Sequence, residues 1–119
     1  MNYNQKVGQF GEMLAKNYLI KHGYQIVATN IKTSYQEIDI IAKHGQLNIF
    51  IEVKTRTNLI FGGADEAINR RKLKNLKKAI NHIIYKNNLD ENFVQIDLVA
   101  IDINKFKKTA KIKHYKNIS

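Results

Sequence analysis

The chain has 119 residues, of which 44% are hydrophobic and 25% are charged, and it contains no cysteine. These values are typical of one globular domain spanning 1–119, and they exclude disulfide bonds, cysteine nucleophiles and cysteine-ligated zinc. Twenty Lys and Arg against ten Asp and Glu give a formal net charge of +10. Such a surplus favours a polyanionic partner, which could be DNA, RNA or an anionic membrane surface, and among these we expect nucleic acid.

The sequence contains neither a signal peptide nor a membrane span. Residues 1–10 have no apolar stretch of the signal-peptide kind, and no run approaches the roughly 18 apolar residues of a transmembrane helix. We therefore expect a cytoplasmic protein without a membrane partner.

The first expected elements are a helix and a strand. Val7, Phe10, Leu14 and Tyr18 recur at steps of three and four residues, the stripe of an amphipathic helix over 6–22. Gly23 follows at the position of a C-terminal cap. The β-forming residues after it predict a strand over 24–29.

A β-hairpin is expected next. Strands over 37–42 and 47–54 flank Gly45-Gln46, which suits a type II′ turn. In the register that this turn sets, Asp39 faces Glu52 and Glu37 faces Lys54, all on one side of the sheet. The opposite side, expected to pack against a helical layer, carries Ile38, Ile40, Ile49, Ile51 and Val53.

The second half of the chain predicts a helix and two strands. A loop over 57–64 leads to a helix over 66–87, capped by Asp65. Its apolar stripe is Leu73, Leu76, Ile80, Ile83 and Ile84. A largely buried strand over 93–103 and an edge strand over 111–115 follow. The order αβββαββ predicts an α/β fold, a mixed β-sheet flanked by helices.

The facing carboxylates Asp39 and Glu52 predict a metal site. Like charges placed opposite each other on neighbouring strands are destabilising unless a proton or a cation lies between them. Oxygen ligands suit Mg²⁺ or Mn²⁺, and Lys54 beside such an ion would orient or deprotonate an attacking water. In the structural alternative, Glu37 pairs with Lys54 across the hairpin and Asp39 faces solvent.

Several motifs in order resemble the YraN family of small bacterial proteins. They are Gly8-Gln9-Phe10-Gly11-Glu12, Gln36-Glu37-Ile38-Asp39-Ile40-Ile41-Ala42, Phe50-Ile51-Glu52-Val53-Lys54-Thr55-Arg56, Phe61-Gly62, Glu66-Ala67, Gln95-Ile96-Asp97-Leu98-Val99 and Ile112-Lys113-His114. The resemblance implies the restriction-endonuclease-like fold, similar to archaeal Holliday-junction resolvases, with a PD-(D/E)XK nuclease site.

Position by position, the resemblance implies roles for five residues. Asp39, Glu52 and the backbone carbonyl of Val53 become metal ligands, Lys54 becomes the water-positioning lysine, and Glu12 lies near the metal. The sequence departs from the family pattern in two places: Gln36 stands where the family usually has Gly, and Ile38 replaces the proline that names the motif.

Basic residues supply the expected nucleic-acid contacts. Arg56 and Lys32 are candidates to flank the scissile strand, and the helix over 66–87 supplies Arg70, Arg71, Lys74, Lys77 and Lys78. The alternative for this cluster is a helix face that is merely solvated. The alternative for Glu12 is an ion pair with Lys16 on the helix surface, four residues away. The four histidines show no metal-ligand spacing and are interpreted as surface or turn residues.

Three functions are compatible with this pattern. The leading hypothesis is a Mg²⁺-dependent endonuclease acting on DNA, with branched DNA as one candidate substrate; a homodimer would supply two sites for two strands. The alternative is a non-catalytic nucleic-acid-binding module of the same fold. A third is a ribosome-associated or scaffold protein that uses charge alone.

Overall fold

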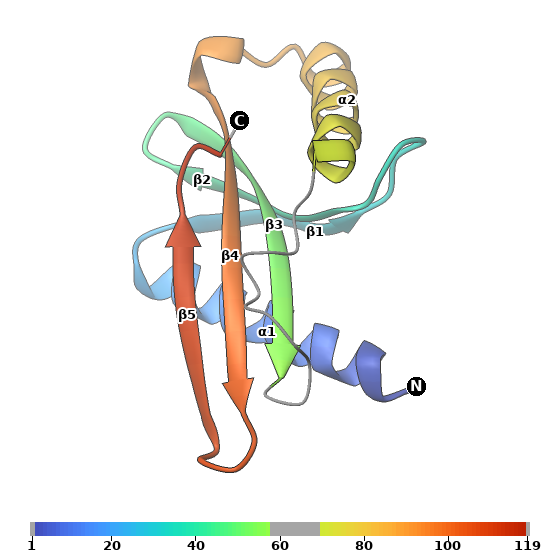
Figure 1. Cartoon of the computed structure of the whole chain (residues 1–119). Helices are drawn as coiled ribbons and strands as arrows, with labels where there is room; N and C mark the ends of the chain where they lie inside the picture. The colour runs from blue at the N-terminus through green and yellow to red at the C-terminus, as the bar shows by residue number, and fades with distance from the viewer. Residues whose placement is uncertain (1, 58–69, 119) are drawn as a thin grey trace.

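The computed structural model describes residues 2–57 and 70–118, and its element order is the predicted one (Figure 1). The elements are α1 (Tyr3–Lys21), β1 (Gln25–Ile31), β2 (Ile38–His44), β3 (Leu47–Thr57), α2 (Arg70–Asn87), β4 (Val94–Asn104) and β5 (Thr109–Tyr115), with a short 3₁₀ helix at Glu91–Phe93. The predicted end of the second helix is confirmed. Its start, the Asp65 cap and nearly all of the loop over 57–64 lie outside the described residues.

The strands form one mixed sheet in the order β1-β2-β3-β4-β5. β3 and β4 are parallel, and the other neighbours are antiparallel. A parallel pair needs a crossover connection, and α2 lies between β3 and β4 in the chain. The predicted α/β class, a mixed sheet flanked by helices, is confirmed, and the arrangement is consistent with the restriction-endonuclease-like fold.

The two helices cover opposite faces of the sheet, as alternation along β3 shows. Ile49 and Ile51 pack with α1, whereas Phe50 between them packs with α2. The α1 cluster consists of Ala15, Leu19, Tyr24, Ile40, Ala42, Ile49, Ile51, Val99 and Ile101. The α2 cluster consists of Ile38, Phe50, Leu76, Ala79, Ile80, Ile84 and Ile96.

The buried stripe of α1 differs from the predicted one. Phe10 is 46% exposed, and the fully buried positions are Gly11, Ala15 and Leu19. A Cβ added at Gly11 would overlap the Thr55 hydroxyl oxygen and lie 2.7 Å from Thr55 Cβ. The small residues therefore let the helix approach β3 closely, which turns Phe10 toward solvent.

The helix ends of α1 are well capped. Asn2 and Gln5 form a reciprocal capping box at the start. At the other end Gly23 has a φ of 87°, its N–H donates to the Ile20 carbonyl, and the next N–H donates to the Leu19 carbonyl. This is a Schellman motif, and it confirms the predicted glycine cap.

The register of the β2–β3 hairpin is confirmed over most of its length. Gly45 has a φ of 61° in the turn, and the five paired positions run from His44–Leu47 to Ile40–Ile51. One face assignment is wrong, because Ile38 packs in the α2 cluster while Ile40 packs in the α1 cluster. The strict alternation of β2 is therefore broken between these two residues.

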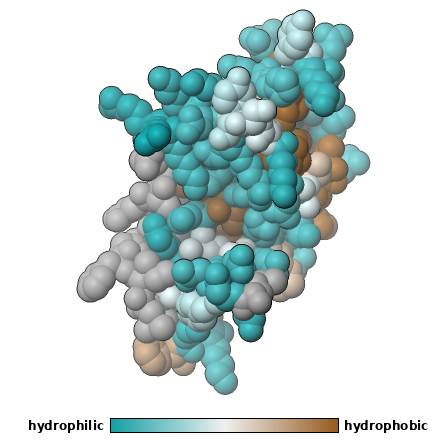
Figure 2. Space-filling model, turned by 90° about the vertical axis from the view of Figure 1, so that its right-hand side faces the viewer, coloured by the Kyte–Doolittle hydropathy of each residue, from teal (hydrophilic) through white to brown (hydrophobic). Residues whose placement is uncertain are grey.

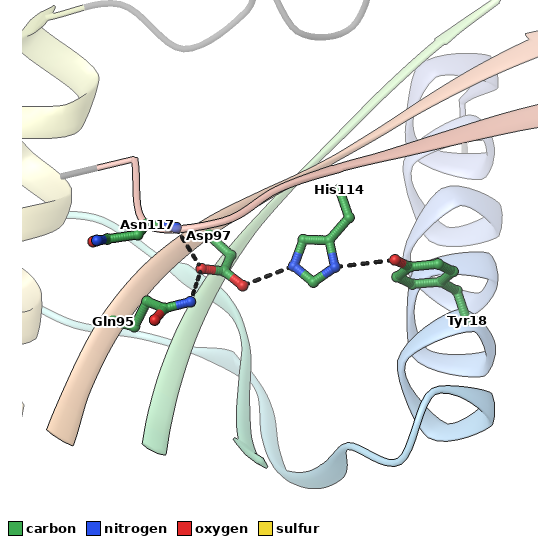
Figure 3. A network of polar contacts seen from close by, with 5 residues as sticks. All are labelled: Tyr18, Gln95, Asp97, His114 and Asn117. Atoms are coloured by element: carbon green, nitrogen blue, oxygen red, sulfur yellow. Dashed lines mark hydrogen bonds and ion pairs between the residues drawn. The ribbon is translucent and has the colours of Figure 1, made fainter. Parts of the chain in front are cut away.

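A buried polar network joins α1 to β4 and β5 (Figure 3). The Asp97 carboxylate, fully buried, accepts from His114 Nε2 at 2.7 Å and from the Asn117 N–H at 3.0 Å. His114 Nδ1 lies 3.1 Å from the Tyr18 hydroxyl oxygen. The interpretation of His114 as a surface or turn residue is therefore wrong. The spacing of the histidines in the sequence does not reveal that β5 brings this one onto Asp97.

Among residues 2–57 and 70–118, neither helix is long and apolar enough to cross a membrane.

Candidate metal centre

The site forms where β2 and β3 part. Their regular pairing ends at Ile40–Ile51, one pair short of Asp39 and Glu52. Instead of facing a paired strand, the Asp39 carboxylate accepts the Val53 N–H at 2.8 Å. This hydrogen bond satisfies a backbone donor and fixes the Asp39 side chain at the point of separation.

Three carboxylates converge here from different elements. One oxygen each of Glu12, Glu37 and Asp39 lie within 4.8 Å of one another, so α1, the residue before β2 and β2 itself all contribute. Oxygen-only donors at this spacing suit a hard divalent cation. Glu12, which was expected near the predicted ligand Asp39, lies beside Asp39 in this group. Glu37, which the predicted hairpin register placed opposite Lys54, joins Glu12 and Asp39 in this group.

Asn30, which the sequence did not indicate as a site residue, lies beside the acidic residues. With its amide nitrogen turned toward them, Asn30 donates to Glu12 at 3.1 Å and to Glu37 at 3.2 Å. Its backbone φ is 51°, a left-handed conformation that Asn tolerates better than most residues. No motif signals this role, because the pairing of β1 with β2 is what brings Asn30 to the site.

Glu52 lies beside this group but is held by a different partner. It is only 4% exposed, and its Oε1 is 2.6 Å from Lys72 Nζ on α2. Its Oε2 is buried and has no hydrogen-bond partner in the described structure. Asp39 and Glu52 are therefore not the directly paired couple that the hairpin register predicted. Asp39 lies with Glu12 and Glu37, and Glu52 forms an ion pair with Lys72.

The carboxylates perturb one another electrostatically. Burial first, and then the negative charge of Glu52, raise the pKa of Asp39 to about 8. Burial and the neighbouring Glu37 raise the pKa of Glu12. A bound cation would relieve this repulsion, and the buried unpartnered Oε2 of Glu52 offers a further ligand. The residues therefore fit Mg²⁺ or Mn²⁺.

Lys54 and Arg56 line a hollow beside the carboxylates. This hollow, of about 310 Å³, is also lined by Glu12 and Val53. Burial, followed by the charges of Lys72 and Arg56, lowers the pKa of Lys54. Arg56 Nε is buried without a hydrogen-bond acceptor in the described structure. An anionic group entering the hollow would find both cations.

Two further hollows share Glu12. One of about 530 Å³ is lined by Asn30 and Glu37, and one of about 170 Å³ by Lys16 and Asp39. The charge of Lys16 acts to lower the pKa of Glu12, but the hydrogen-bond donor to Glu12 is Asn30. Both Lys16 and Asn30 therefore act on Glu12, so the helix-surface pair with Lys16 is compatible with a position in the acidic group.

The predicted basic residues lie in three places: on the exposed face of α2, in the hollow that Arg56 lines, and in a hollow that Lys32 lines. The five expected on α2 are all exposed: Arg70, Arg71, Lys74, Lys77 and Lys78. Figure 2, which views the side on which α2 lies in Figure 1, shows a mostly hydrophilic surface with smaller hydrophobic patches. Lys32 lines a separate hollow with His82 and Lys86 of α2. The structure therefore does not bring Lys32 together with Lys54 and Arg56.

These elements define a small mixed α/β protein with an acidic cluster where two strands of its sheet part. The chain belongs to the uncharacterised protein family UPF0102, whose model matches residues 11–101. The resemblance to the YraN family is thereby confirmed.

Relatives match over most of the chain. It is 42% identical to a UPF0102 protein of Caldicellulosiruptor bescii over 118 residues, which cover 98% of each chain. It is 33% identical to a UPF0102 protein of Clostridium novyi over 116 residues, 98% of this chain and 97% of the relative. A UPF0102 protein of Shewanella sediminis is 39% identical over 95 residues, 80% of each chain.

Proposed function

We propose that the protein is a Mg²⁺-dependent endonuclease acting on DNA, with branched DNA as one candidate substrate. The observation that supports this most strongly is the convergence of Glu12, Glu37 and Asp39 beside the buried Glu52. Carboxylates gathered in this way, with Glu52 buried and Glu12 and Asp39 partly buried, next to a lysine with a lowered pKa, are an arrangement suited to phosphodiester hydrolysis.

Asp39 and Glu52 would hold the ion, with Glu12 and Glu37 close by and the Val53 carbonyl as the further ligand that the family resemblance implies. When bound, a divalent ion lowers the pKa of a coordinated water and stabilises charge on a phosphoryl group. Lys54 would orient the attacking water, and its lowered pKa makes the neutral, proton-accepting form more accessible at neutral pH.

The basic side chains would bind the phosphate groups of the nucleic acid. Arg56, which lines the same hollow as Lys54, would donate from its guanidinium group to a phosphate oxygen there. The exposed lysines and arginines of α2 would contact the phosphates beyond it, independently of base sequence.

Cleavage of labelled linear duplex, single-stranded and four-way-junction DNA, each with Mg²⁺ and with Mn²⁺, tests the proposal. We expect metal-dependent cleavage of at least one substrate. Asp39→Asn and Lys54→Ala should each lower the rate by about 100-fold or more, because each removes a ligand or a proton-transfer group. Lys43→Ala, which removes an exposed lysine elsewhere on β2, is the control and should leave the rate nearly unchanged. Intact substrates under all conditions would refute the proposal.

A non-catalytic nucleic-acid-binding module is the second candidate. The observation that favours it is the exposed basic face of α2, because these side chains could bind nucleic acid without any catalytic role for the carboxylates. This function predicts salt-sensitive binding without cleavage, with an affinity that Asp39→Asn leaves unchanged.

A further inference from the structure

We propose that Lys72 is an internal cation that neutralises Glu52 before metal binds, and that a divalent ion competes with Lys72 for this carboxylate. This inference rests on the proposed function, because it concerns loading of the same metal centre. Lys72 would thus control the affinity of the site for metal without being a metal ligand itself.

The position of Lys72 separates it from the other basic residues of α2. Its neighbours Arg70, Arg71 and Lys74 are exposed, whereas the Lys72 side chain is only 31% exposed and reaches the sheet. Its ammonium lies 2.6 Å from Glu52 Oε1, and the Glu52 side chain is almost fully buried. This lysine is therefore part of the acidic site rather than of the outer surface.

A buried carboxylate needs a compensating charge, because removal from water strongly disfavours an isolated ion. In the absence of metal Lys72 supplies that charge to Glu52, and its positive charge also acts to lower the pKa of Asp39. An ion held between Asp39 and Glu52 would provide the same compensation. Two cations at one carboxylate repel each other, so metal binding and the Lys72–Glu52 pair compete.

Mn²⁺ binding, followed by the loss of free-ion EPR signal or by calorimetry, tests the competition without any substrate. We expect Lys72→Gln to bind Mn²⁺ about tenfold more tightly than wild type. Lys74→Gln removes the same charge from an exposed position on the same helix, and should stay within about twofold of wild type. Lys72→Arg, which keeps the charge, should also remain close to wild type.

The sign of the change separates competition from a structural role. If Lys72 only supported the fold, its loss would weaken Mn²⁺ binding or leave it unchanged, and either result would overturn the inference. Thermal unfolding provides a second readout: Lys72→Gln should melt below wild type in EDTA and gain more than wild type from Mn²⁺. Wild-type protein that bound no Mn²⁺ would overturn the metal centre itself, and the inference with it, whereas equal binding by wild type and Lys72→Gln would overturn only the inference.

Discussion

Asp39 is held in place by a backbone hydrogen bond that does not depend on its charge. Both the protonated and the ionised carboxyl can accept the Val53 N–H, so the side chain keeps its position when no cation is present. Burial and Glu52 nevertheless favour the protonated form, as the raised pKa shows. At this position, ionisation opposes stability unless a cation is bound.

This raised pKa predicts a pH-dependent stability. Between the ordinary value of 3.8 and about 8, the folded protein retains a proton that the unfolded chain releases. The contribution of Asp39 to the free energy of unfolding therefore falls as pH rises through this range. Asp39→Asn imitates the protonated form and removes the loss.

Thermal unfolding in EDTA at pH 5 and pH 8 measures the effect. The melting temperature of Asp39→Asn, relative to wild type, should rise by several degrees between the two pH values. Glu91→Gln, which changes an exposed carboxylate far from this group in the chain, should show a smaller change. A constant difference for Asp39→Asn would contradict the assignment of a raised pKa.

Part of the site was predictable from residue order, and part was not. The two-residue turn at Gly45 and Gln46 fixed the hairpin register, and so placed Asp39 near Glu52. Side-chain alternation does not show where backbone pairing stops, so the parting of the strands was not predictable. Lys72 resembles its basic neighbours in sequence, and only the packing of α2 against the sheet shows that it reaches Glu52.

Between elements, the contact of α1 with β3 positions Glu12. Gly11 precedes Glu12 directly, and the backbone of α1 approaches Thr55 too closely for any side chain at position 11. By contrast, Gly8 lies one turn earlier in the same helix, and a Cβ there would meet nothing within 4 Å. Alanine substitutions at the two glycines should therefore have opposite effects on stability.

Gly11→Ala should destabilise the protein by about 1–3 kcal/mol, because α1 must move away from β3. Gly8→Ala should stabilise it by about 0.5–1 kcal/mol, because alanine favours a helix and fits the open space. Urea unfolding measures both free energies of unfolding. Equal effects of the two substitutions would show that α1 does not approach Thr55 this closely.

The Tyr18–His114–Asp97 network fixes α1 and β5 to β4 on one face of the sheet (Figure 3). Burial alone would raise the pKa of Asp97, but hydrogen bonds from His114 and from the Asn117 N–H outweigh it and lower the pKa. Asp97 is therefore ionised, and it depends on these donors to remain so inside the protein.

His114→Leu should cost about 3 kcal/mol of stability, because it leaves the buried Asp97 carboxylate without its hydrogen-bond donor at 2.7 Å. His82→Leu, on the exposed surface of α2, should change stability by no more than about 0.5 kcal/mol. Denaturant unfolding of both variants at neutral pH provides the comparison. A cost at His114 as small as that at His82 would show that the network contributes little.

The elements themselves followed well from periodicity and turn residues. The strand over 93–103 and the helix end at Asn87 agree with β4 and α2 to within one residue. The face of α1 did not follow, because hydrophobicity favoured burial of Phe10. A close helix–strand approach instead selects the smallest residues, Gly11 and Ala15, which carry little hydrophobic signal.

The net charge of the protein is the strongest indication of its partner. The surplus of +10 includes the exposed basic side chains of α2, on the mostly hydrophilic side shown in Figure 2. A duplex bound along this helix would release counterions from each contacted phosphate. Binding should therefore weaken steeply with salt.

Lys77→Gln should reduce the slope of log affinity against log salt concentration by about 0.9 for duplex DNA, since one phosphate contact is lost. Lys107→Gln, in the turn between β4 and β5, removes the same charge away from α2 and should change the slope much less. Fluorescence anisotropy at several salt concentrations gives both slopes. Equal slopes for the two variants would show that α2 is not the DNA-binding face.

Mn²⁺ titration of wild type and Asp39→Asn shows whether the acidic group at the parting of β2 and β3 is a metal site. We predict saturable binding of one ion by wild type and at least about tenfold weaker binding by Asp39→Asn, because the variant loses a charged ligand. Wild-type protein that takes up no Mn²⁺, or that binds it no better than Asp39→Asn, would contradict the account.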